Sequence, residues 1–277
     1  MLFKNYTTYI LITVFFVCTS NVRAEEIRAN EYENGYIQSG YLNRDKNKIL
    51  VATNHKSNDK STVRFTKAWC EGDKSLQNIS FSHFQPSQPA KTNHRQIDSN
   101  FDFDEGDLYK ISPQKNAKFC FLFNSDFLKV KKLLPGFNLT QAPMPKLLLK
   151  QISTIKVRSI QQSWMLAKLS NGALYGSVLF KPIGNQELAS DVISSNGELY
   201  FEDFPTVRKN KGEDLWGLDD GGVFEPRFGG LLFSYNTTKG IVIAIIGYGA
   251  EGVNLEIKEY GHFPPKKIYS NYFYTLN

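Results

Sequence analysis

Two Asn-Gly dipeptides constrain the fold of this chain more than any other feature, because each one divides a strand-like stretch. Asn171-Gly172 lies within "WMLAKLSNGALYGSVLF", and Asn196-Gly197 lies within "SNGELYFEDF". An Asn-Gly pair tolerates the positive φ angles of a two-residue turn and is the strongest short signal for a β-hairpin. The second half of the chain is therefore predicted to contain antiparallel hairpins.

Short strand-like runs also fill the first half of the chain. They are rich in β-branched and aromatic residues and are separated by polar turn clusters. These runs are 48–54, 62–69, 78–84, 107–112 and 118–123. Aromatic residues make up 14% of the chain and alternate within the runs, which indicates that they pack in a core rather than form a platform for a ligand.

Helical signals are few, and they predict two short helices. In "NSDFLKVKKLL" (124–134), Asn124 or Ser125 can cap the first turn, an acid stands in that turn and lysines follow. Pro135-Gly136 then ends the helix. We interpret "QELASDVIS" (186–194) as the second helix. The predicted fold class is mostly β, with antiparallel hairpins and meanders in sandwich- or barrel-like packing and one or two short helices.

The best candidate for a domain boundary is "PGFNLTQAPMP" (135–145), which holds three prolines and no periodicity. This boundary predicts an N-terminal β-rich domain at 25–135 and a C-terminal β-rich domain at 146–277. One continuous β domain with a long crossing is the alternative, since β domains often reach this size.

The first 24 residues, "MLFKNYTTYILITVFFVCTSNVRA", have the pattern of a secretory signal peptide. Lys4 precedes a short apolar run, and Val22-Arg23-Ala24 offers small residues for cleavage after Ala24. The apolar run is shorter than the roughly 20 residues that a membrane-spanning helix needs, and no other segment is long enough. We therefore expect a periplasmic or secreted protein with no transmembrane segment in the mature chain.

Two cysteines, Cys70 and Cys120, remain after removal of the signal. An exported chain meets an oxidising compartment, where an even number of cysteines favours a disulfide. Such a bridge closes a loop of about 50 residues and contributes about 4 kcal/mol on the chain-entropy argument. Two buried thiols are the alternative.

The stretch "IVIAIIGYGAEG" (241–252) has glycines in the G-x-G-x-x-G spacing of a dinucleotide-binding loop. Such a loop needs a strand before it and a helix after it. Here "VNLEIKEY" (253–260) alternates apolar and polar residues, which is typical of a half-buried strand. We therefore predict a hairpin of strands 240–248 and 253–260, and we expect no NAD or FAD.

The acidic, glycine-rich segment 212–230 is the strongest candidate for a ligand site, because long loops on rigid sheets often carry function. Clustered carboxylates can bind Ca²⁺ or cleave a glycan, while Trp216 can stack on a ligand and Arg227 can pair with an acid or an anion. The candidate residues are Glu213, Asp214, Trp216, Asp219, Asp220 and Arg227. A solvated connection between strands is the alternative.

Specific metal motifs are missing from the sequence. The run 98–107 resembles a calcium loop, but its glycine falls one position early, and we interpret it as a surface turn. The four histidines show no zinc-binding spacing. We therefore expect no metal and no cofactor, with Ca²⁺ at 212–230 as the exception that stays open.

Charge is segregated along the chain. Nine basic residues and no acid lie between Phe127 and Gln186, whereas ten acids and three basic residues lie between Glu187 and Glu225. In one interpretation these charges pair with one another across a sheet. In the other, a basic face meets anionic envelope material or a partner protein. The sequence favours internal pairing.

No complete catalytic motif is present, since the chain lacks a nucleophile elbow and a phosphate-binding loop. We therefore expect an exported cell-envelope binding or interaction protein without catalytic activity. Its partner would be an envelope protein or an anionic glycan. The net charge of +6 is mild and gives no reason to expect nucleic acid. A secreted glycan hydrolase using carboxylates in 212–225 and a structural envelope component are the alternatives.

Overall fold

A computed structural model describes residues 35–52, 64–93, 95–207, 224, 226, 230–249, 251–261 and 263–275. The predicted signal peptide lies outside these residues. The described part is mostly β and carries two helices, α2 and α3, as the fold class prediction required. None of its helices is long and apolar enough to cross a bilayer.

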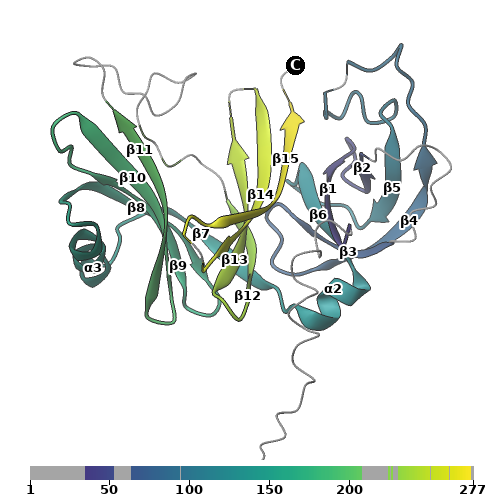
Figure 1. Ribbon diagram of the computed structural model, residues 1–277. Helices are drawn as coiled ribbons and strands as arrows, with labels where there is room; N and C mark the ends of the chain where they lie inside the picture. Colours follow the sequence, from purple (N-terminus) through teal and green to yellow (C-terminus); the bar gives the residue numbers. More distant parts are fainter. Residues whose placement is uncertain are drawn as a thin grey trace, which may run out of the picture.

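The first half forms a closed, antiparallel six-stranded barrel (Figure 1). Its strands are β1 (Ile37–Leu42), β2 (Lys48–Val51), β3 (Phe65–Cys70), β4 (Gln77–Gln85), β5 (Gly106–Ile111) and β6 (Phe119–Asn124), in the order β1-β2-β5-β4-β3-β6. Five of these strands, β2 to β6, follow the predicted runs closely, whereas β1 was not predicted. Strand β6 pairs with β1 and β3 and is buried along its whole length, because its alternate side chains pack in two different core clusters.

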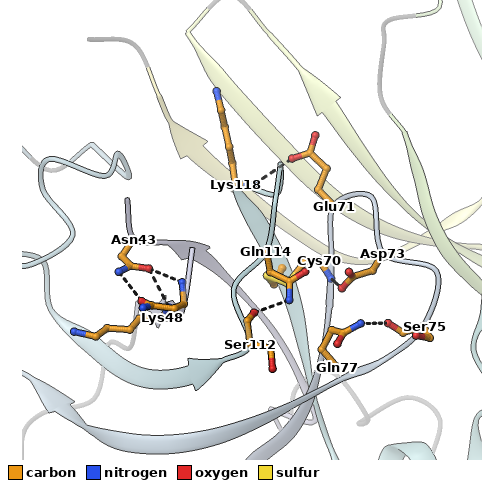
Figure 2. Close-up of a disulfide and its surroundings, with 12 residues drawn as sticks. Asn43, Lys48, Cys70, Glu71, Asp73, Ser75, Gln77, Ser112, Gln114 and Lys118 are labelled. Carbon is orange, nitrogen blue, oxygen red and sulfur yellow. Dashed lines mark hydrogen bonds between the residues drawn. A yellow bond between two sulfur atoms is a disulfide. The ribbon is translucent and has the colours of Figure 1, made fainter. Parts of the chain in front are cut away.

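The predicted disulfide joins Cys70 at the end of β3 to Cys120 on β6. The two residues are direct cross-strand partners, and both are fully buried. Beyond Cys70 the chain turns, and the Asp73 carboxylate accepts a 2.8 Å hydrogen bond from the Cys70 backbone N–H (Figure 2). The bridge thus ties neighbouring barrel strands at one turn.

The second half forms an antiparallel nine-stranded sheet in the order β11-β10-β9-β8-β7-β12-β13-β14-β15. Its strands are β7 (Leu134–Ala142), β8 (Ile160–Leu169), β9 (Leu174–Phe180), β10 (Gln186–Ser195), β11 (Glu198–Val207), β12 (Leu231–Asn236), β13 (Ile241–Tyr248), β14 (Gly252–Tyr260) and β15 (Lys266–Tyr274). The β8–β9 and β10–β11 hairpins turn at the two Asn-Gly pairs. At the second turn, Asn196 and Gly197 have the expected positive φ angles of 53° and 82°.

The hairpin predicted at the glycine-rich stretch is confirmed. Strands β13 and β14 pair continuously from Ile241↔Tyr260 to Tyr248↔Val253, so residues 253–260 are a strand. Three of the apolar residues of β14 that alternate in the sequence, Val253, Leu255 and Ile257, all pack into one core cluster.

The helix predicted at 186–194 is wrong, because this segment is strand β10 and pairs with both β9 and β11. Both faces of β10 are covered: Val192 packs on one face, and Ile193 packs in a different cluster on the other. A strand buried on both faces loses its apolar–polar alternation, and its sequence can then resemble a helix.

The predicted helix after Asn124 is α2 (Ser125–Val130), and it ends earlier than expected. The Asn124 side chain accepts a 2.8 Å hydrogen bond from the Phe127 backbone N–H, which confirms the cap. The segment 135–145 is mostly strand β7, which pairs with β8 and β12. Helix α3 (Lys146–Lys156), which follows Pro145 directly, is not among the predicted helices.

One apolar cluster joins the barrel to the sheet. Trp69, Phe121 and Phe123 of the barrel pack with Phe233 of β12, where the ring centroids lie 5.3–5.8 Å apart. The same cluster takes in Leu255 and its neighbours on β14. Barrel and sheet thus share a core, and the division into domains 25–135 and 146–277 stays a prediction.

Candidate functional site

The six candidate residues of the segment 212–230 lie outside the described residues. These are Glu213, Asp214, Trp216, Asp219, Asp220 and Arg227. Within the same segment, the Phe224 ring is described and lies 5.9 Å from the Trp164 ring and 6.2 Å from the Phe204 ring. Phe224 therefore contacts one aromatic ring from β8 and one from β11.

The sheet brings together a polar row that sequence reasoning missed. Trp164, Ser177, Asp191 and Glu202 are cross-strand partners in β8, β9, β10 and β11. Because directly opposite residues point to the same face of a sheet, these four side chains share one face. We call it the inner face, and we call the face that contacts α3 the outer face.

Asp191 is the most perturbed carboxylate of the inner face. Its Oδ2 accepts a 2.9 Å hydrogen bond from the Tyr175 hydroxyl, and its Oδ1 accepts one from the Ser177 hydroxyl. Burial raises the pKa of Asp191 to about 6, although these two hydrogen bonds favour the charged form. Burial, together with the charge of Asp191, also raises the pKa of Tyr175 well above its ordinary value.

A second group of charges connects β11 to β14. The Lys258 ammonium lies 2.9 Å and 3.0 Å from the two carboxylate oxygens of Glu202, and 3.0 Å from Glu256. Burial lowers the pKa of Lys258, but the two carboxylates outweigh it and raise the value overall. The Tyr260 hydroxyl donates a 3.1 Å hydrogen bond to Glu202, and Lys267 pairs with Glu256 at 2.7 Å.

These contacts show how strongly the sheet curls. Six strands separate β11 from β14 in the sheet order, yet Glu202 and Lys258 are in direct contact. Both oxygens of Asp191 and both oxygens of Glu202 already accept hydrogen bonds from within the sheet. Groups satisfied in this way stabilise the curl, and they offer a ligand little unused hydrogen-bonding capacity.

Helix α3 covers the outer face of β8–β11 (Figure 1). Its side chains Leu148 and Ile152 point inward, one turn apart, and pack in a cluster with Met165, Val178 and Val192. At the C-terminal end, Lys156 bonds both oxygens of Asp203 at 2.6 Å and 2.7 Å and lies 4.1 Å from the Phe201 ring. Asp203 also accepts a hydrogen bond from Ser190. The helix is therefore held to the sheet by packing and by one ion pair.

The exposed part of α3 is apolar and basic at once. Leu147 is 71% exposed and Ile155 is 56% exposed, and the exposed Lys146 and Lys150 accompany them. Among the described residues, neither lysine forms an ion pair. A groove with a volume of about 400 cubic ångströms runs beside Leu147, Lys150 and Ile155. Gly197 and Leu199 of the β10–β11 hairpin form its far wall.

The same character continues past the end of α3. Val157 is 83% exposed and ends the helix in the left-handed region, at φ 50° and ψ 39°. Arg158 donates a 3.4 Å hydrogen bond to the Gln186 carbonyl in the β9–β10 turn, where Ile183 is 55% exposed. We define the α3 surface as Lys146, Leu147, Lys150, Ile155, Val157, Arg158, Lys181 and Ile183.

The structure bears on both interpretations of the segregated charge. Lys156 belongs to the basic run and Asp203 to the acidic run, so their ion pair is one instance of internal pairing, although it joins helix α3 to strand β11 and not two strands. Lys146 and Lys150 belong to the same basic run and point away from the sheet. The pattern that could have predicted their helix is "KLLLKQISTIK", where apolar residues recur at helical spacing between lysines.

Metal sites are absent from the part of the chain that the structure describes, where no three His, Cys, Asp or Glu side chains converge. The run 98–107 is mostly turn, with Phe101 buried against Tyr41 and with Asp104 accepting a hydrogen bond from the Tyr41 hydroxyl.

No protein-family model matches this chain, and no curated protein and no solved structure is detectably similar to it.

Proposed function

We propose that this protein is an exported binding protein of the cell envelope, without a catalytic role, which holds anionic material on its α3 surface. The observation that carries the proposal is the side of α3 that faces solvent. There, two exposed lysines with no ion pair among the described residues stand beside exposed Leu147 and Ile155 along a groove. Unpaired cations beside an apolar surface favour an anionic partner.

The Cys70–Cys120 bridge supports the location, because disulfides persist in oxidising compartments such as the periplasm and the extracellular space. The predicted signal peptide leads to the same compartment. Asp191 and Glu202 of the inner face already have all of their oxygens engaged within the sheet. The carboxylates of the alternative hydrolase, in 212–225, lie outside the described residues.

The test is retention on an anionic polymer. The disulfide-bonded protein is applied to dextran sulfate beads and to uncoated dextran beads over a range of salt concentrations. We expect retention on the sulfated beads alone, weakening as salt rises, because exposed charges are screened over about 10 Å at 0.1 M salt.

A matched pair of double variants localises the binding. Lys146→Gln with Lys150→Gln removes two charges from the α3 surface, and Lys48→Gln with Lys110→Gln removes two exposed lysines from the barrel. At about 1 kcal/mol for each cation near an anionic surface, the first variant should bind about thirty-fold more weakly. Equal loss in both variants, or equal retention on both kinds of bead, would overturn the proposal.

A further inference from the structure

The α3 surface carries more exposed apolar side chain than binding to a soluble anion requires. Leu147, Ile155, Val157 and Ile183 are all more than half exposed, and they stand among cations. Helices with one apolar side and flanking lysines lie flat in the interface of anionic membranes, with the apolar side chains buried among the lipid headgroups.

Val157 provides a second, independent observation. Its backbone N–H closes the helix by bonding to the carbonyls of Ser153 and Thr154, in a conformation for which glycine is the usual residue. A β-branched residue there is a clear outlier, and it carries backbone strain. Its side chain is 83% exposed, so the strain is not offset by packing within the chain. Strain of this kind points to a functional use of the side chain.

The charge around these apolar side chains has one sign. The basic members of the surface are Lys146, Lys150, Arg158 and Lys181, and no acid occurs between Phe127 and Gln186. Asp203, the acid that contacts α3, is already paired with Lys156. Glu198 belongs to the same hairpin as the groove wall, but it alternates with Leu199 and therefore points to the other face of the sheet.

We infer that the α3 surface docks on an anionic lipid bilayer. Leu147, Ile155, Val157 and Ile183 enter the headgroup region, while the flanking cations contact lipid phosphates. The inference rests on the proposed function and narrows its anionic material to lipid. Helix α3 suits this role because Leu148, Ile152 and Lys156 fix its other side to the sheet, so its exposed side chains are presented as one rigid unit.

The test is co-sedimentation with vesicles of phosphatidylcholine alone and of phosphatidylcholine mixed with phosphatidylglycerol. The wild-type protein should bind the mixed vesicles only. The double variant Leu147→Gln with Ile155→Gln should weaken this binding about a hundred-fold, since each substitution removes a large apolar side chain from the interface. Val130→Gln is the control, because Val130 is 68% exposed on α2, away from this surface.

Val157→Gly separates docking from folding. Glycine relieves the left-handed strain, so the variant should melt at a higher temperature than the wild type. Loss of the apolar side chain should at the same time weaken binding to the mixed vesicles about ten-fold. A variant that is more stable and yet binds more weakly cannot owe its defect to misfolding.

The bead and vesicle measurements distinguish the two proposals. The protein could be retained on dextran sulfate while the apolar variants bind the mixed vesicles as strongly as the wild type. That result would overturn the lipid inference and leave the proposed function standing. Failure on both the beads and the mixed vesicles would overturn both proposals. A dimer in light scattering that Leu147→Gln dissociates would mean that a second copy of the chain covers the surface, which also overturns the lipid inference.

Discussion

The two faces of strands β8–β11 differ in how their charged groups are satisfied. On the inner face, Asp191 and Glu202 are bonded by hydroxyls and by Lys258, which leaves their oxygens engaged. On the outer face, α3 uses Lys156 for an internal pair and presents Lys146 and Lys150 outward. The inner face has the more perturbed pKa values, yet the outer face has the groups available to a partner. A structural cluster thus differs from a binding surface in whether its polar groups already have partners within the protein, more than in how many such groups it has.

The largest expected effect tests whether the inner cluster is structural. Lys258→Met should lower the free energy of unfolding by about 4 kcal/mol, because it leaves Glu202 and Glu256 in a buried site without their shared cation. Urea denaturation measures the change. Lys267→Met is the control, since Lys267 is mostly exposed and should cost less than about 1 kcal/mol. Equal losses would contradict the structural role.

The next effect is the pH dependence of Asp191. Its pKa in the folded protein is about 6, above the ordinary 3.8, so the folded state holds this proton more tightly than the unfolded state. This contribution to stability is present below pH 4 and is lost as the pH rises through 6. Asp191→Asn does not titrate, so between pH 4 and pH 7 the wild type should lose about 2 kcal/mol relative to the variant.

Urea denaturation of both proteins across that pH range measures the Asp191 difference. Because the other carboxylates are common to both proteins, the comparison isolates this one group. If the difference in the free energy of unfolding stays constant from pH 4 to pH 7, the pKa of Asp191 is not raised. The inner face would then lose its most perturbed group.

A smaller effect contrasts two neighbouring leucines of α3. Leu148→Ala should destabilise the protein by about 2 kcal/mol, because Leu148 is buried against the outer face of the sheet. Leu147→Ala should change stability by less than about 0.5 kcal/mol, because Leu147 is 71% exposed. Chemical denaturation decides between them, and comparable losses would mean that α3 packs differently.

The smallest effect is a gain in stability. Val157→Gly should raise the free energy of unfolding by about 1 kcal/mol, because the residue ends α3 in the left-handed region. Thermal and urea unfolding give the value. A loss of stability would indicate that the Val157 side chain packs within the chain, and it would remove the strain argument for the α3 surface.

Several parts of the fold could be predicted because their signals are local. The Asn-Gly turns, the Asn124 cap and the alternation in 253–260 each depend on residues a few positions apart. The disulfide could be predicted from cysteine number and compartment, although Cys70 and Cys120 become neighbours only through the pairing of β3 with β6. The identity of β10 could not be predicted, because burial on both faces hides periodicity. The end of α2 could not be predicted either, because Leu134 and Pro135 pair with the distant strand β12.

Local patterns in the sequence specify the β class, the hairpins and the separation of charge into a basic and an acidic run. Which charges meet depends on long-range contacts, because curling of the sheet places Lys258 against Glu202 and α3 places Lys156 against Asp203. These contacts join residues 56 and 47 positions apart, and no local pattern specifies them. The α3 surface depends on the tertiary structure for the same reason, since its lysines are among the members of the basic run that folding leaves exposed.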